Sequence, residues 1–154
     1  MNASADHSLL VPCPACAAFN RVPREKLGSA PNCGRCHQSL FTGKPLALDG
    51  AGFQRHVGQG EVPVLVDFWA PWCGPCRSMA PQFEAAAAAL EPGLRLAKVD
   101  TDAEPELGAR YGIRSIPTLV LFRCGREVAR QAGAMGSAQI AQWARQHGAQ
   151  VSRP

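Results

Sequence analysis

The sequence lacks any apolar stretch that approaches the roughly 20 residues needed to cross a membrane. Its first residues also lack the basic start and apolar core of an export signal, because the longest early apolar run is Leu9-Leu10-Val11. We therefore expect a soluble, cytoplasmic protein without a membrane partner. In that reducing compartment, closely spaced cysteines indicate metal binding or redox chemistry rather than a disulfide scaffold.

The sequence also has little charge imbalance. The formal net charge of the 154-residue chain is +4, and the first 48 residues carry five Lys/Arg against two Asp/Glu. Such an excess is a weak footprint for a nucleic-acid partner. Aromatic residues that could stack on bases are scarce in this region, where Phe19 and Phe41 are the only two. The pattern favours a solvated basic surface over nucleic-acid binding.

A glycine fingerprint for dinucleotide binding is missing as well. Gly58-Gln59-Gly60 begins like such a motif, but Pro63 stands where the third glycine is needed. The sequence therefore predicts that the protein holds no flavin or nicotinamide of its own.

What the sequence does contain is seven cysteines, six of them in Cys-x-x-Cys pairs. Two pairs, Cys13/Cys16 and Cys33/Cys36, are separated by sixteen residues, a spacing that matches a four-cysteine zinc site. Two disulfides, a mononuclear iron site and independent redox pairs are competing interpretations. A reducing compartment disfavours the disulfides, and spacing alone does not separate zinc from iron. We favour one zinc ion bound by all four cysteines.

The region around these two pairs is rich in proline and glycine and poor in periodic apolar residues, so it is expected to consist of loops and turns. With too little apolar material for a useful core, it would need the metal to supply its folding energy. We expect a zinc-ribbon-like module over 1–45 and a second domain over 46–154. His37, directly after a ligand, is expected to be a bystander.

Beyond this boundary the pattern predicts alternating strands and helices. The expected strands are 62–70, 94–99, 118–123 and 127–131, and the expected helices are a short one capped by Asp49, 75–90, a short one capped by Asp102, and 137–147. Pro81 should kink the second helix. A strand–helix–strand unit followed by a hairpin and a helix predicts an α/β fold, with a mixed sheet covered by helices on both faces.

The third pair, Cys73 and Cys76, lies where a buried strand ends and a helix begins. Free amides and the helix dipole stabilise a thiolate at the first position, whereas the second lies about one turn further in. The Cys73 thiolate would attack a target disulfide, and Cys76 would resolve the mixed disulfide. Half of a metal site is the alternative, disfavoured because no second pair is close and because Gly-Pro suits a strand-to-helix turn.

Two stretches of sequence carry a resemblance to a known family. Residues 67–76 read DFWAPWCGPC and resemble the active-site signature of thioredoxins, and residues 111–118, YGIRSIPT, are similar to a second thioredoxin motif. The resemblance covers about residues 46–148. Together with the cysteine-rich module, the chain resembles the bacterial thioredoxin 2 group, which carries a zinc site ahead of the thioredoxin domain. This resemblance implies the thioredoxin fold and the activity of a protein-disulfide reductase.

The resemblance also implies roles for individual residues. Asp67 matches the buried acid that relays the proton of the second cysteine, and burial would raise its pKa. Lys98 matches the lysine near that acid. Pro117 matches a cis-proline beside the redox pair, which exposes the Ile116 backbone for pairing with a substrate chain. The implied substrate-binding residues are Trp72, Gly74, Pro75, Ile116, Pro117 and Gly133.

The family further implies disulfide-containing proteins as substrates and a separate NADPH-dependent thioredoxin reductase as the source of electrons. A disulfide oxidase or isomerase is a second hypothesis, opposed by the Gly-Pro dipeptide and the missing export signal. A zinc-dependent binding module or chaperone is a third, which would bind partners without Cys73 and Cys76. Cys124 is expected to be an exposed free thiol, and Trp69 and Trp143 are expected in the core.

Overall fold

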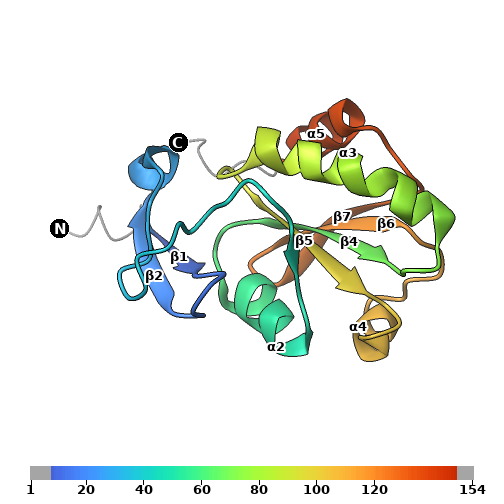
Figure 1. Cartoon of the computed structure of the whole chain (residues 1–154), viewed down its shortest axis with the longest axis horizontal. Coiled ribbons are helices and arrows are strands. Elements are labelled where there is room, and N and C mark those ends of the chain that lie inside the picture. The colour runs from blue at the N-terminus through green and yellow to red at the C-terminus, as the bar shows by residue number, and fades with distance from the viewer. Residues whose placement is uncertain (1–7, 149–154) are drawn as a thin grey trace.

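The computed structural model describes residues 8–148 of the chain, so the outer ends of both expected domains, 1–7 and 149–154, lie outside the described residues. Figure 1 shows a small two-stranded sheet at one end of the molecule and a larger sheet with helices on both sides.

The small sheet belongs to the cysteine-rich module. Strands β1 (Ser8–Pro12) and β2 (Phe19–Pro23) form an antiparallel hairpin, and the 3-10 helix η1 (Arg24–Ser29) follows. The expectation of loops without a core is therefore wrong. The buried residues of this module's cluster are Leu9, Val11, Cys13, Val22, Leu27, Cys33, Leu40 and Val62. Alternation in β1 places Leu9 and Val11 on one face, and Val62 arrives from the other domain.

The larger sheet is mixed, as the sequence predicts. Its strand order is β3 (Leu46–Ala47), β5 (Arg95–Asp100), β4 (Val64–Trp69), β6 (Thr118–Arg123) and β7 (Arg126–Ala132). Strands β3 and β4 run parallel to β5, whereas β6 is antiparallel to both β4 and β7. Strand β4 is thus paired on both edges, and its nearly continuous apolar sequence fits a strand that is buried on both faces.

Helices cover the two faces of this sheet. Helices α3 (Gly74–Leu90) and α5 (Ser137–Gln146) lie on one face, and α2 (Gly50–Phe53), the π-helix η2 (Gln54–Gln59) and α4 (Pro105–Arg110) lie on the other (Figure 1). Each layer has its own apolar cluster, because alternate strand residues point to opposite faces. Leu65 packs with the α3 cluster and Val66 with the other, so strand geometry places Asp67 on the α3 side.

Several helix details follow the sequence. The buried residues of α3 are Cys76, Met79, Phe83, Ala86, Ala87 and Leu90, and the helix ends at Leu90 as expected. Pro81 lies inside the helix, and the kink expected there stays a prediction. Asp49 caps α2 through a 2.7 Å hydrogen bond from the Gly52 amide. Gly112 ends α4 in a left-handed conformation, with φ of 61°.

Two sequence-based expectations need correction. The N-cap of α4 is Glu104 rather than Asp102, and it makes no side-chain cap hydrogen bond. The carboxylate of Asp102 instead accepts a 2.8 Å hydrogen bond from the indole of Trp72. Trp69 and Trp143 are half-buried rather than fully inside the core, because both lie at the margin of the packed layers.

The two parts of the molecule meet along the chain that leads into β4. The Glu61 amide donates to the Leu10 carbonyl at 2.8 Å, and the Leu10 amide donates to the Glu61 carboxylate at 2.7 Å. A Cβ added at Gly60 would come within 2.6 Å of the His56 carbonyl in η2 and within 3.0 Å of the Pro12 ring in the module. This joint therefore has no space for a side chain at position 60.

We predict that Gly60→Ala lowers the free energy of unfolding by about 1–3 kcal/mol, because the new methyl group overpacks a backbone contact. Gly28→Ala is the matched control, since nothing lies within 4 Å of a Cβ at that position. Urea unfolding of both variants measures the difference. Equal stabilities for the two variants would show that the joint tolerates the methyl group.

Candidate functional site

The third cysteine pair lies at the start of α3, directly after the loop that leaves the central strand β4. Cys73 and Cys76 form a disulfide, with their Cα atoms 5.2 Å apart. Cys73 is the N-cap of α3, and its sulfur accepts a 3.2 Å hydrogen bond from the Cys76 amide. Cys73 is 4% exposed and Cys76 is 1% exposed. The free helix terminus thus directs an N–H donor at the sulfur that is predicted to become a thiolate.

Several residues of the predicted docking surface lie around this disulfide. The Cys73 sulfur is 3.7 Å from the Ile116 carbonyl oxygen, and the Ile116–Pro117 peptide bond is cis. The Gly133 amide donates to the Pro117 carbonyl at 2.9 Å, which places this glycine next to the same loop. Trp72 is 67% exposed, an unusual state for so large an apolar ring. Gly74 and Pro75 form the first turn of α3 beside it.

The exposed side chain of Trp72 has a hydrogen-bond partner. Its indole N–H is fixed by the Asp102 carboxylate at 2.8 Å, across the gap between the β4–α3 loop and the loop before α4. Sequence analysis missed this role of Asp102, because thirty residues separate the two partners and an acid ahead of a helix is typical of a cap. The contact orients an exposed aromatic ring next to the dithiol.

Asp67 lies within β4 and is fully buried, with 0% of its surface exposed. Neither carboxylate oxygen has a hydrogen-bond partner among the described residues. Burial raises the pKa of Asp67 to about 7, although the charge of Lys98 opposes the shift. An acid that titrates near neutral pH on the α3 side of the sheet is suited to proton transfer.

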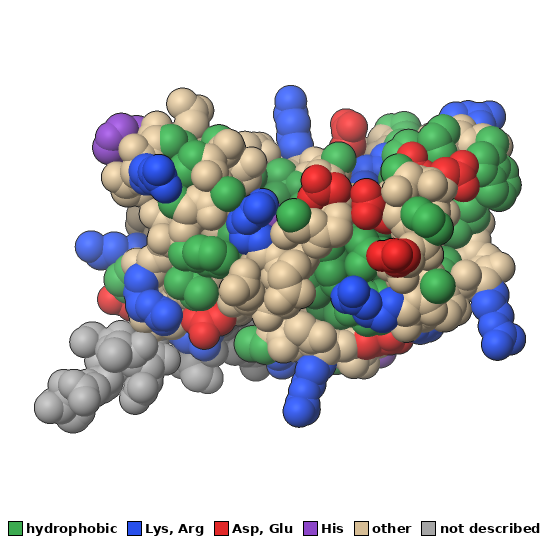
Figure 2. Space-filling model, turned by 90° about the horizontal axis from the view of Figure 1, so that it is seen from below, with side chains coloured by type: hydrophobic (Ala, Val, Ile, Leu, Met, Phe, Trp, Pro, Cys, Tyr) green, Lys and Arg blue, Asp and Glu red, His purple; other side chains and the backbone are tan. Residues whose placement is uncertain are grey.

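Lys98 is the neighbour of Asp67 in the parallel β4–β5 pair. Its ammonium group lies 4.3 Å above the ring of Trp69, a cation–π contact. Lys98 also lines a cleft of about 800 Å³ whose wall includes Pro14 of the cysteine module. Figure 2 looks onto the face that carries α2 and α4, and the acidic and basic side chains that it shows are interspersed.

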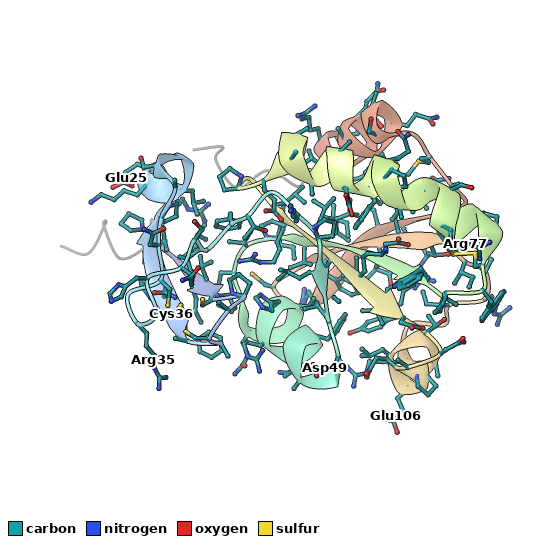
Figure 3. All side chains as sticks on the ribbon, viewed as in Figure 1. Glu25, Arg35, Cys36, Asp49, Arg77 and Glu106 are labelled. Carbon is teal, nitrogen blue, oxygen red and sulfur yellow. A yellow bond between two sulfur atoms is a disulfide. The ribbon has the colours of Figure 1, made fainter. Side chains whose placement is uncertain are left out.

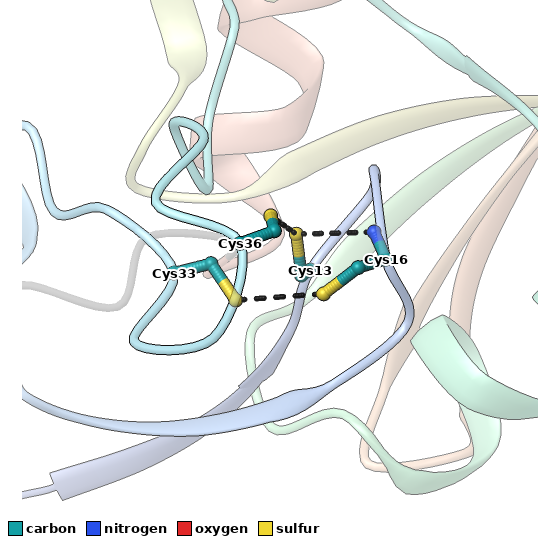
Figure 4. Close-up of side chains that lie close together, drawn as sticks. All are labelled: Cys13, Cys16, Cys33 and Cys36. Carbon is teal, nitrogen blue, oxygen red and sulfur yellow. Dashed lines mark hydrogen bonds between the residues drawn. The ribbon is translucent and has the colours of Figure 1, made fainter.

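The other two cysteine pairs converge on one point (Figure 4). The four sulfur atoms of Cys13, Cys16, Cys33 and Cys36 all lie within 4.8 Å of one another, and all four cysteines are free. Two cross-pair sulfur distances, Cys13–Cys36 and Cys16–Cys33, are 3.6 Å. Sulfurs around a tetrahedral zinc at the usual 2.3 Å would be about 3.8 Å apart. The donor set and its spacing therefore fit a tetrahedral thiolate site.

Both cysteine loops have the same hydrogen bonds. The Cys13 amide donates to the Ala18 carbonyl at 2.8 Å, as the Cys33 amide does to the Gln38 carbonyl. The residue after each second cysteine, Ala17 or His37, has a positive φ and donates its amide to the carbonyl of the first cysteine. We call each of these loops, 13–18 and 33–38, a knuckle. His37 is exposed and has a turn conformation.

Amide groups surround the sulfurs of the cluster. The Ala15 and Cys16 amides donate to the Cys13 sulfur at 3.3 and 3.4 Å. Hydrogen bonds, chiefly from the Cys36 amide and further from the Arg35 amide, lower the pKa of Cys33 to about 6 against the effect of burial. Such donors favour the thiolate form that a metal requires.

Asn20 is a residue that sequence reasoning missed. Its amide nitrogen donates to the Ala18 carbonyl at 3.3 Å and to the Cys33 sulfur at 3.5 Å, and its amide oxygen accepts from Gly34 at 2.9 Å. Asn20 thus joins the two knuckles from β2. No spacing rule marks it, since only the hairpin brings it between loops that are distant in sequence.

The dithiol and the four-cysteine cluster lie at opposite ends of the molecule. Figure 3 places Arg77, which follows the redox pair, at one end and Cys36 at the other. Cys124 belongs to neither site and is an exposed free cysteine in the β6–β7 turn, as predicted. Within residues 8–148, no helix combines the length and apolar character needed to cross a membrane.

A disulfide at the N-terminus of a helix, placed after the central strand of a mixed sheet and faced by a cis-proline, defines a thiol–disulfide oxidoreductase. The family model for thioredoxin matches residues 44–146, and the zinc-ribbon model described as "Thioredoxin 2, N-terminal" matches residues 12–38. The chain therefore belongs to the thioredoxin family, whose members exchange electrons with disulfides through a pair of thiols.

Individual relatives agree with this assignment. Thioredoxin C-3 of Corynebacterium nephridii is 47% identical over 135 residues, which cover 88% of this chain and 92% of the relative. That span is too long to fit the thioredoxin match alone, so the similarity extends into the cysteine module. Thioredoxin 1 of Nostoc sp. is 45% identical over 62% of this chain and 89% of its own. Thioredoxin of Porphyra purpurea is 48% identical over 55% of this chain and 79% of its own.

We predict that Asp67→Asn stabilises the protein at pH 8 but gives little gain near pH 4. Because folding raises the pKa of this acid from 3.8 to about 7, the penalty for its charge is small near pH 4, grows as the pH rises from 4 to 7, and levels off above pH 7. The gain at pH 8 should reach at most roughly 4 kcal/mol.

Urea unfolding at both pH values tests this prediction. Asp49→Asn is the control, since it exchanges an exposed carboxylate for an amide that also caps a helix. A stability difference between wild type and Asp67→Asn that does not change with pH would show that the Asp67 charge carries no folding cost.

Proposed function

We propose that this chain is a cytoplasmic protein-disulfide reductase in which Cys73 is the nucleophile and Cys76 the resolving thiol. The observation that carries the assignment is the position of Cys73 at the α3 N-cap, with the Cys76 amide directed at its sulfur. Cys76 lies one turn into the helix and is buried, so the thiolate forms first at Cys73.

The reaction consists of two exchanges. The Cys73 thiolate attacks one sulfur of a substrate disulfide, which forms a mixed disulfide and releases the other substrate sulfur as a thiolate. The Cys76 thiol then loses its proton and attacks Cys73, which releases the second substrate thiol and leaves the Cys73–Cys76 disulfide. A separate NADPH-dependent thioredoxin reductase returns two electrons, and two protons follow.

Asp67 accepts the proton of Cys76 in the second exchange. Its support is a fully buried carboxylate without a hydrogen-bond partner and with a pKa near 7. An acid with this pKa gains and loses a proton readily at neutral pH. Lys98 stabilises the ionised form of Asp67, because its positive charge lowers the pKa that burial raises.

The substrate docks on the surface beside the dithiol. The exposed ring of Trp72 is oriented by Asp102, and the carbonyl of Ile116 lies next to the Cys73 sulfur. An extended substrate segment would pair with the Ile116 backbone, next to Pro117, and would cover Gly74, Pro75 and Gly133. Main-chain pairing explains how one surface accepts disulfide proteins of different sequence.

The four-cysteine cluster holds one zinc ion, within a module that ends near residue 45. The support is the set of four converging sulfurs together with the zinc-ribbon match. Zinc bound by four protein ligands has no open position for a substrate, and the cluster lies at the far end from the dithiol (Figure 3). Its function is therefore to stabilise the module rather than to take part in thiol exchange.

We expect Cys73→Ser to reduce the turnover of an interchain disulfide in a small protein substrate to background. Cys76→Ser should accumulate a mixed disulfide with that substrate, because attack proceeds and resolution does not. Cys124→Ser is the matched control, an exposed free cysteine outside both sites. Turnover assays and mass spectrometry under non-reducing conditions measure these outcomes. Normal turnover by Cys73→Ser would remove this residue as the nucleophile.

We expect one zinc per chain in protein purified under reducing conditions, and none in a Cys13→Ser/Cys16→Ser double variant. Disulfide reduction should continue in the double variant, because the dithiol lies in the other domain. Elemental analysis gives the metal content, with Cys124→Ser as the control. Iron in place of zinc, or no stoichiometric metal in the wild type, would refute the zinc assignment.

A further inference from the structure

Arg95 is the largest side chain that is fully enclosed in the described part of the molecule, with 2% of its surface exposed. It is the first residue of β5, in the thioredoxin domain. Removal of a guanidinium group from water costs several kcal/mol unless charges or hydrogen bonds compensate it. The groups around Arg95 must therefore offset the free-energy cost of burying its charge.

The hydrogen bonds of Arg95 cross into the cysteine module. Its Nη2 atom donates to the Pro12 carbonyl at 3.3 Å and to the Leu40 carbonyl at 3.0 Å, and its Cζ atom lies 4.6 Å above the Phe41 ring. Pro12 directly precedes the ligand Cys13. Leu40 and Pro31 flank the second knuckle on its two sides, and the Leu40 amide donates to the Pro31 carbonyl at 3.0 Å. One nitrogen atom thus joins the bases of both knuckles.

These carbonyl groups carry only partial charge, and in the described part of the chain no carboxylate lies within 4 Å of the Arg95 guanidinium. Across residues 8–148 the ion pairs within 4 Å are Arg21–Glu61 and Arg130–Glu127. Glu91 is near enough to influence Arg95, but its carboxylate accepts hydrogen bonds from the Gly43 and Leu96 amides. Among residues 8–148, Arg95 therefore has no carboxylate within 4 Å, and Glu91 acts on it only at longer range.

The neighbouring His56 does not compensate the positive charge of Arg95. Burial, reinforced by the positive charges of Arg95 and Arg55, lowers the pKa of His56 to about 3, so its ring stays neutral. The Nδ1 atom of His56 has no hydrogen-bond partner among the described residues. The charged groups that favour the Arg95 cation are Glu91 and the sulfur of Cys13, both of which raise its pKa against the effect of burial.

We propose that Arg95 is the counter-charge of the metal centre and that it couples metal loading to docking of the cysteine module on the thioredoxin domain. This inference rests on the proposed zinc site. Four thiolates around a divalent zinc carry a net charge of about −2. Arg95 places a fixed positive charge behind Cys13, on the side where the module faces β5. Metal loading places an anionic centre near Arg95, which has no carboxylate within 4 Å among residues 8–148.

The coupling is reciprocal. If the charge of Arg95 tightens zinc binding, bound zinc must stabilise the docked position of Arg95 by the same factor. Zinc loading would then strengthen the joint between the module and the thioredoxin domain. Arg95 acts as a positioning residue here, because it touches the carbonyl of Pro12 and not the metal.

The test compares zinc affinity in wild type, Arg95→Met and Arg95→Lys, by competition with a chromogenic chelator. Arg95→Met keeps an apolar stem but loses the charge, and it should weaken zinc binding by about 10- to 100-fold. Arg95→Lys keeps the charge, so its zinc affinity should fall by clearly less than that of Arg95→Met. Lys26→Met, which removes an exposed cation on η1 of the same module, should leave the affinity unchanged.

A second measurement follows the coupling itself. The zinc-dependent rise in the melting temperature of the wild type should shrink in Arg95→Met and persist in Arg95→Lys. Disulfide reduction by Arg95→Met serves as the check that its thioredoxin domain is folded. The cobalt(II) absorption of the thiolate site, recorded for each variant, reports whether all four sulfurs still bind the ion.

The outcomes separate the two proposals. Absence of zinc binding in the wild type would overturn the zinc assignment. Zinc binding by the wild type with equal affinity in Arg95→Met would overturn the role of Arg95 alone. Equal losses in Arg95→Lys and Arg95→Met would also overturn it, since packing rather than charge would then account for the effect. If Arg95→Met does not fold, Arg95→Lys is compared with Lys26→Met. A loss of zinc affinity of about 10-fold or more in Arg95→Lys, which keeps the charge, would then overturn the role of the charge.

Discussion

The pairing of β4 with β5 on one side and with β6 on the other is the constraint on which the rest of the structure depends. It brings the loop after β4, which carries the dithiol, next to the cis-proline loop before β6. It also sets Lys98 beside Asp67, inside the sheet. At the other end of the same pairing, β5 begins with Arg95, which reaches the cysteine module. The two edges of β4 thus align the redox site at one end and the contact with the cysteine module at the other.

The sequence was most informative where chemistry depends on local spacing. The Cys-x-x-Cys pairs, the helix α3 and the mixed α/β architecture could all be predicted, because each follows from local sequence patterns and from the order of the elements. Contacts over long sequence distances could not. Asp102 looked like a helix cap, yet it holds Trp72 across thirty residues. The small core of the module was missed because its apolar alternation spans only Leu9 and Val11, and because Val62 comes from the other domain.

Asp67 and Arg95 show two ways in which a folded protein keeps a charge-bearing side chain in its interior. Asp67 has no hydrogen-bond partner in the described part of the chain, so burial shifts its pKa into the neutral range and leaves it reactive. Arg95 donates to two carbonyl groups and stacks on Phe41, so it remains a cation. The first arrangement yields an acid that titrates near neutral pH, whereas the second uses hydrogen bonds from a cation to join two parts of the molecule.

The two knuckles share one pattern of hydrogen bonds, and each has a left-handed residue after its second cysteine. His37, which by composition resembles an additional ligand, therefore occupies the same turn position as Ala17. A left-handed backbone is the requirement at this position, and the side chain is incidental to it. The four cysteines of the module are thus presented by a six-residue loop that occurs twice, rather than by a single long loop. The residues between the cysteines differ, Pro14-Ala15 in one copy and Gly34-Arg35 in the other, so the shared element is the pattern of backbone hydrogen bonds and not the side chains.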